Sequence, residues 1–113
     1  MTNAKTSYTG EVREVYSGDD LVVLVDLGTE DLWKRQRIRL FGVDTPNGMS
    51  AAADSNAGRV RAYVRAMTKG KKVRIEVTSR TSNSWVAIVT VDTPDGPKNL
   101  NDDLIAQGFK YKR

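Results

Sequence analysis

The hydrophobic period of this sequence changes in a definite order, and that order restricts what a chain of 113 residues can fold into. Apolar and polar residues alternate over residues 8–16 and 37–43, which is the period of a half-buried strand. Between them, residues 21–27 form a dense apolar run with too many β-branched side chains to favour a helix. Turn residues around Gly18 and Gly28 separate the segments, and such short connections favour an antiparallel meander.

The next part of the chain has a helical period and then returns to alternation. A helix capped by Asp54 or Ser55 and ended by Gly70 is predicted from apolar residues three or four positions apart, namely Ala57, Val60, Val64 and Met67. Alternation over 73–77 predicts a fourth strand, and residues 85–91 are expected to form a fifth.

A short last helix is expected from Asn99 or Asn101 to Gly108. The fold class is therefore mainly β with α: a five-stranded OB-type β-barrel with a helix between strands 3 and 4 and a short helix after strand 5. Periodicity alone also permits other small α+β folds. Residues 1–7 are expected to be a flexible N-terminus, and residues 8–113 a single domain.

Composition limits the chemistry more than it identifies it. The chain has no cysteine and no histidine, which excludes disulfides, thiolate metal sites and the commonest general base. The net charge of +4 is compatible with nucleic acid but is weak evidence for it. No apolar run approaches the ~18 residues of a membrane span, and no signal peptide is visible. We expect a soluble chain without a membrane partner, and its location and oligomeric state stay open.

Two segments carry a resemblance to a known family: VYSGDDLVV at residues 15–23 and RIRLFGVDTP at 37–46. In their order and spacing they resemble the staphylococcal nuclease-like (thermonuclease) domain family, in which a D-G-D-T turn and an R-L-x-x-V-D-T-P segment hold the active site. Residues 71–77 and 100–109 resemble later elements of the same family in register. The helix that usually ends the family's fold has no counterpart here.

The resemblance implies a metal site. Asp19 and Asp44 match the family's metal-binding aspartates, and the carbonyl of Thr45 would be a further ligand. Two carboxylates on one rim repel unless a cation neutralises them, and Ca²⁺ accepts such oxygen ligands. The alternative is that Asp19 shapes a turn and Asp44 caps the end of a strand.

The catalytic set that the resemblance implies is incomplete. Arg39 matches a phosphate-clamping arginine, whose planar fork of donors binds two phosphate oxygens. Asn47 stands where the family has its general-base glutamate, and an amide cannot accept the proton. Ser84 is the nearest match to a second arginine and carries no charge. Arg80 lies upstream and is a weaker substitute.

Basic residues suggest a nucleic-acid surface, although each by itself is equally compatible with a solvated face. The candidates are Lys34, Arg35, Arg61, Arg65, Lys69, Lys71 and Lys72. Three functions follow from the sequence. The first is a domain that binds DNA or RNA with weak or no phosphodiester hydrolysis. The alternative is an active calcium-dependent endonuclease, and the second alternative is a non-catalytic protein-interaction barrel.

Overall fold

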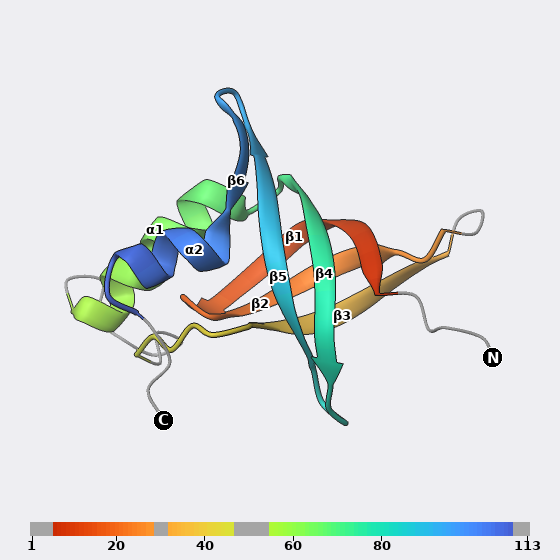
Figure 1. The fold of residues 1–113 in the computed structure, drawn as a ribbon, viewed down its shortest axis with the longest axis horizontal. Helices are drawn as coiled ribbons and strands as arrows, with labels where there is room; N and C mark the ends of the chain where they lie inside the picture. Colours follow the sequence, from red (N-terminus) through yellow and green to blue (C-terminus); the bar gives the residue numbers. More distant parts are fainter. Residues whose placement is uncertain (1–5, 29–31, 47–54, 110–113) are drawn as a thin grey trace.

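The computed structural model describes residues 6–28, 32–46 and 55–109, which form strands and two helices (Figure 1). The elements in chain order are β1 (Ser7–Ser17), β2 (Asp20–Asp26), β3 (Trp33–Leu40), α1 (Asn56–Thr68), β4 (Lys72–Arg80), β5 (Trp85–Thr93), β6 (Gly96–Asn99) and α2 (Leu100–Ala106). The two helices lie together at one end of the strands in Figure 1. None of the described helices is long and apolar enough to cross a membrane.

The strands form one sheet in the order β3-β2-β1-β4-β5-β6, and this sheet closes on itself. Successive neighbours are antiparallel, whereas β3 meets β5 in a parallel pairing that joins residues 38–40 to residues 85–87. This pairing makes β1 to β5 a closed barrel and leaves β6 as an extra strand on β5. The predicted five-stranded barrel with one helix between strands 3 and 4 and a short helix after strand 5 is confirmed.

Side chains that point inward on alternate strand positions form the barrel core. On β4 the buried residues are Val73, Ile75 and Val77, and on β5 they are Trp85, Ala87, Val89 and Val91. Helix α1 adds Val60 and Val64, and α2 adds Leu100 and Leu104. The β-branched side chains fit this pleated, enclosed surface, which agrees with their strand preference.

The predicted helix starts are confirmed, whereas the predicted bounds of the third strand are wrong. Ser55 caps α1 by accepting a hydrogen bond from the backbone N–H of Gly58 at 3.0 Å, and Asn99 caps α2. The third strand begins at Trp33, not at Arg37, and ends at Leu40. Gly42 lies in a turn with φ +75°, not on the strand. Residues 33–36 lack an apolar alternation, and they are extended because they pair with β2.

One buried side chain links α2 to the barrel. The Oδ1 atom of Asn101 accepts a hydrogen bond from the backbone N–H of Val89 at 2.9 Å. Its Nδ2 donates to the carbonyl oxygens of Phe41 at 2.9 Å and Ala87 at 3.1 Å. Asn101 is 3% exposed, so these three backbone groups have a side-chain partner where water is excluded. This residue therefore positions the turn that follows β3.

A hydrogen bond between the two helices involves a tyrosine, and its ionisation is expected to lower the stability of the fold at alkaline pH. Tyr63 on α1 donates its hydroxyl to Asp103 on α2, and this bond, followed by burial and the nearby charge, raises the pKa of Tyr63 above its ordinary value. A raised pKa in the folded state means that the stabilisation is fully present below the unfolded pKa and disappears as pH rises through the folded one. We expect stability to fall above about pH 10.

Tyr63→Phe is expected to flatten this alkaline decline, because phenylalanine has no proton to lose. Urea denaturation from pH 8 to 11.5 on both chains measures the difference. An equally steep decline in the variant would show that another group causes it, and Tyr8→Phe is the matched control because Tyr8 lies on β1, outside the contact between the helices.

Candidate functional site

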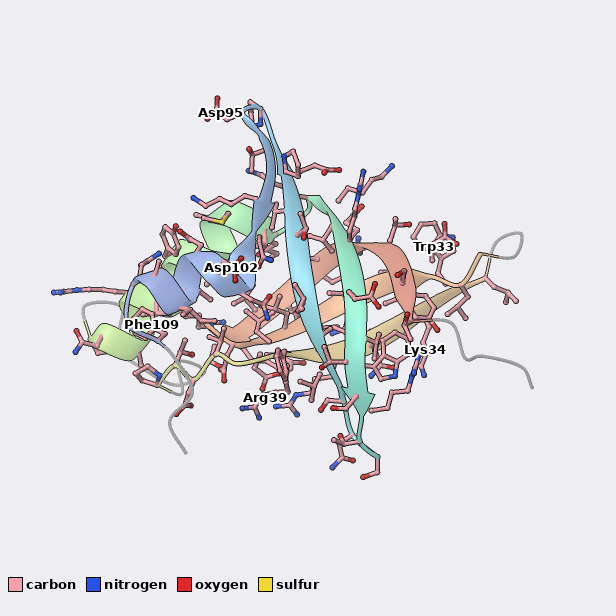
Figure 2. The ribbon with its side chains drawn as sticks, in the orientation of Figure 1. Trp33, Lys34, Arg39, Asp95, Asp102 and Phe109 are labelled. Atoms are coloured by element: carbon pink, nitrogen blue, oxygen red, sulfur yellow. The ribbon has the colours of Figure 1, made fainter. Side chains whose placement is uncertain are left out.

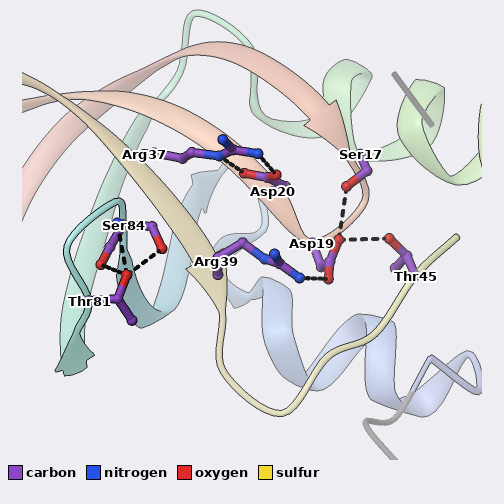
Figure 3. Close-up of polar contacts among 8 residues, drawn as sticks. All are labelled: Ser17, Asp19, Asp20, Arg37, Arg39, Thr45, Thr81 and Ser84. Atoms are coloured by element: carbon purple, nitrogen blue, oxygen red, sulfur yellow. Dashed lines mark hydrogen bonds and ion pairs between the residues drawn. The ribbon is translucent and has the colours of Figure 1, made fainter. Parts of the chain in front are cut away.

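The turn between β1 and β2 holds a buried carboxylate that touches β3 (Figure 3). Asp19 is 3% exposed, and its Oδ1 accepts hydrogen bonds from the hydroxyls of Ser17 at 2.9 Å and Thr45 at 3.1 Å. Its Oδ2 accepts a hydrogen bond from Nη2 of Arg39 at 3.2 Å. The guanidinium of Arg39 is half exposed, so Asp19 orients it at the protein surface.

A second ion pair stands beside the first. Arg37 binds Asp20 with both Nε, at 2.9 Å, and Nη2, and the hydrogen bond to Asp20 is the main reason that the pKa of Arg37 is raised. The guanidinium also lies 5.4 Å from the centre of the Tyr16 ring. A bidentate pair of this kind fixes the arginine plane, so β3 presents two oriented guanidinium groups on its outer face.

The residues predicted to bind calcium differ in burial and in their hydrogen-bond partners. Thr45 is buried and bonded to Asp19, whereas Asp44 is exposed and its backbone N–H donates to the carbonyl of Phe109 at 2.8 Å. Both oxygens of Asp19 accept from protein donors, and one donor is a cation. No cluster of three or more acidic side chains occurs among the residues that the structure describes. This donor set does not fit Ca²⁺, which prefers several oxygen ligands, and calcium binding stays a prediction.

The other two predicted catalytic positions are Asn47 and Ser84. Asn47 lies outside the described residues. Ser84 ends the loop between β4 and β5, where its backbone N–H donates to Oγ1 of Thr81 at 3.0 Å and its carbonyl accepts from the same hydroxyl. Figure 3 shows this loop across from Arg39. Arg80, the possible substitute, lies 5.1 Å over the Trp85 ring.

A pocket of about 840 Å³ joins these elements at the end of β3. Arg37 and Arg39 contribute its charged side, and the polar side chains of Thr81, Asn83 and Ser84 contribute the opposite side. Its apolar surface consists of Leu40, Phe41, Val43, Val86 and Ile105. Figure 2 labels Arg39 at the lower side of the molecule in that view. The arrangement suits a ligand with an apolar group next to a negative one.

The pocket contains residues that the sequence analysis did not select. Phe41 is 53% exposed although it follows the buried Leu40, and Ile105 reaches the pocket from α2. A large apolar side chain left this exposed beside charged groups is a feature of binding surfaces. The sequence pattern predicted that Phe41 lies on a strand, because the alternation of residues 37–43 does not indicate the turn at Gly42.

The predicted basic residues fall into separate groups. Lys34 and Arg35 lie on β3 with Arg39, and Lys34 is 5.3 Å from the Trp85 ring. Arg61 donates to the carbonyl of Val15 at 2.9 Å and so supports the packing of α1 on β1. The remaining four, exposed near the last turn of α1 and the start of β4, are Arg65, Lys69, Lys71 and Lys72. Because β4 begins opposite the far half of β5, the two exposed groups do not form one patch.

Comparison with known proteins identifies the fold. Neither the family models nor the curated proteins compared with this sequence gave a match. Among solved structures, the chain is similar to the extended Tudor domain TD3 of mouse TDRD1, solved in complex with a MILI peptide containing dimethylarginine 45. The TM-score is 0.69 at 11% identity, over 96% of this chain and 94% of that chain. At this identity the likeness concerns the fold alone: the chain is a β-barrel similar to that domain.

Proposed function

We propose that this chain is a non-catalytic interaction barrel that binds a peptide in the pocket at the end of β3. The observation that carries the proposal is the exposed ring of Phe41 on an apolar floor bordered by Arg37 and Arg39. An apolar side chain of the peptide would cover the ring, and an adjacent carboxylate would accept hydrogen bonds from the guanidinium groups.

Local neutralisation favours a peptide over a polyanion at this site. Arg37 is paired with Asp20 and Arg39 with Asp19, so each arginine has a carboxylate within hydrogen-bonding distance. Phosphate binding draws its free energy mainly from counterion release at unpaired cations. A peptide gains from the apolar floor as well, and this gain does not depend on net charge.

The ligand of the Tudor-like neighbour supports a peptide but not the same side chain. That domain was solved with a peptide containing dimethylarginine. A methylated arginine keeps its positive charge, and the rim of the present pocket is formed by two guanidinium groups. The side chain of a methylated arginine accepts no hydrogen bond from these donors, whereas a carboxylate could accept hydrogen bonds from both guanidinium groups, so we propose an acidic peptide with an aromatic or aliphatic anchor.

Selection from a phage-displayed library of random dodecapeptides tests this function. The expected result is enrichment of peptides with one aromatic or aliphatic residue next to aspartate or glutamate. Phe41→Ser is expected to weaken the selected peptides by about tenfold or more, because it removes the apolar contact. Leu32→Ser is a matched control, since Leu32 is 55% exposed and does not line the pocket. Equal binding by both variants would contradict the proposal.

Single-stranded nucleic acid is the second candidate, and one observation favours it. Arg35, Arg37 and Arg39 alternate on the outer face of β3 in line with the half-exposed Trp33. Cations next to an aromatic ring are typical of sites that bind a nucleic-acid backbone and stack a base. Nucleic-acid binding is also the function that the resemblance to the staphylococcal nuclease-like family implies.

Oligonucleotide assays separate the candidates. Binding of dT12 or U12 that weakens steeply between 50 and 200 mM salt would support nucleic acid, whereas a peptide ligand predicts weak and nonspecific oligonucleotide binding. Cleavage of the same oligonucleotides with calcium but not with chelator would support the endonuclease alternative over both, and Arg39→Ala should then abolish it.

A further inference from the structure

The third strand has an edge that is paired along only part of its length. On one side, β3 pairs with β2 from residue 33 to residue 39. On the other side, the described pairing is with β5 and involves residues 38–40. Among the residues that the structure describes, residues 33–37 therefore have strand neighbours on one side and none on the other.

Two hydrogen bonds show which backbone groups point to that open side. The N–H of Leu40 donates to the carbonyl of Asp19 at 2.9 Å, on the β2 side. The N–H of Phe41 donates to the carbonyl of Ala87 at 2.8 Å, on the β5 side. Because amide directions alternate along a strand, the backbone groups of the odd-numbered residues, Arg35 and Arg37 included, face the open edge.

A groove of about 470 Å³ runs along this edge. Residues 34–37 of β3 form one wall, and residues 81–83 of the loop between β4 and β5 form the other. The groove shares Arg37, Thr81 and Asn83 with the pocket described above, so the two are continuous. An extended chain whose anchor occupies the pocket would therefore pass along the open edge.

Both faces of the edge carry positive charge. Arg35 is exposed on the outer face, where its contact with the half-exposed Glu14 spans 3.4 Å. Lys34 is exposed on the other face, beside the ring of Trp85. Side chains of an added strand point alternately to the two faces, so the glutamates of an alternating sequence all share one face and would meet a cation on whichever face they take. Charge complementarity thus selects an acidic partner.

We propose that the open edge of β3 at residues 33–37 binds an acidic peptide as an added β-strand. This inference rests on the proposed function and specifies its mode: backbone hydrogen bonds along the edge hold the peptide, and the pocket receives its anchor side chain. Strand addition supplies affinity through main-chain bonds and specificity through alternate side chains, which matches an edge next to a pocket.

The test uses a capped peptide of the sequence VEVEVEVF on the full chain, with VKVKVKVF as its charge-reversed control. Hydrogen exchange measured by NMR is expected to show at least about tenfold slower exchange of the Arg35 and Arg37 amides when VEVEVEVF is present. Arg35→Pro removes the edge N–H and should weaken binding by about tenfold, whereas Arg35→Ala keeps that N–H and should weaken it by less than about threefold.

The outcomes separate this inference from the function on which it rests. If library-selected peptides bind through Phe41 but VEVEVEVF leaves the Arg35 and Arg37 amides unprotected, strand addition is wrong and the peptide function stands. Equal binding by Arg35→Pro and Arg35→Ala, with both variants folded by circular dichroism, would overturn it in the same way. If no peptide is selected at all, the proposed function and the strand addition both fail.

Discussion

Asn101→Ala is expected to destabilise the fold by about 4 kcal/mol, the largest loss that we expect from one polar side chain. The substitution leaves the N–H of Val89 and the carbonyls of Phe41 and Ala87 without their side-chain partner. Each buried backbone group left unsatisfied costs about 1–3 kcal/mol, and local water entry recovers part of the sum. Urea denaturation at neutral pH measures the change in the free energy of unfolding.

Two further variants test whether the hydrogen bonds of Asn101 cause this loss of stability. Asp102→Ala alters an exposed neighbour on the same helix and is expected to change stability by about 0.5 kcal/mol or less. Asn101→Asp keeps the acceptor for Val89 but places a carboxylate against two carbonyl oxygens, so it should cost at least as much as alanine. A loss below about 1 kcal/mol for Asn101→Ala would mean that α2 is not fixed by these bonds.

Gly18→Ala is expected to cost about 2–3 kcal/mol and to disturb the site at the same time. A Cβ atom at this position would lie 2.3 Å from Cγ1 of Val60 and 2.8 Å from Cγ2 of Thr45. Both neighbours are buried, so α1 and the segment after β3 must each move away from the turn that contains Gly18. Moving Thr45 breaks its hydrogen bond to Asp19, and Arg39 then loses part of its support.

Gly70→Ala is the matched control for this prediction. Gly70 has φ +76° and no atom within 4 Å of a built Cβ, so alanine there causes backbone strain without a steric clash. Its cost should be about 1 kcal/mol, and the peptide affinity should not change. Equal losses of stability and affinity in the two variants would show that the contact of Gly18 with α1 is not a tight one.

Local signals in the sequence predicted much of the fold. The caps at Ser55 and Asn99 are properties of a few consecutive residues, and the structure has both. The alternation over residues 73–77 likewise predicted the buried face of β4. The start of β3 was not predicted because Lys34 and Arg35 are exposed and only pairing with β2 makes them extended.

The site was predicted in part, because its long-range contacts are not visible in a single sequence. Asp19 and Arg39 were selected, and the structure brings their side chains together. Their interpretation as a metal ligand and a phosphate clamp came from resemblance, and these roles stay predictions. Phe41 and Ile105 were missed, since their exposure depends on a turn at Gly42 and on where α2 packs.

The parallel pairing of β3 with β5 also bears on how the chain folds. It joins residues 38–40 to residues 85–87, far apart in the sequence, whereas β1 with β2 and β4 with β5 are joined by short turns. Closing a long loop for few contacts costs more entropy than zipping a hairpin. We therefore expect the meander of β1 to β3 and the hairpin of β4 and β5 to form before the barrel closes through the parallel pairing. In the native state the described β3–β5 pairing has three residue pairs, the fewest of any strand pairing in the barrel, so we expect local opening to begin there and to expose the pocket before the rest of the barrel unfolds.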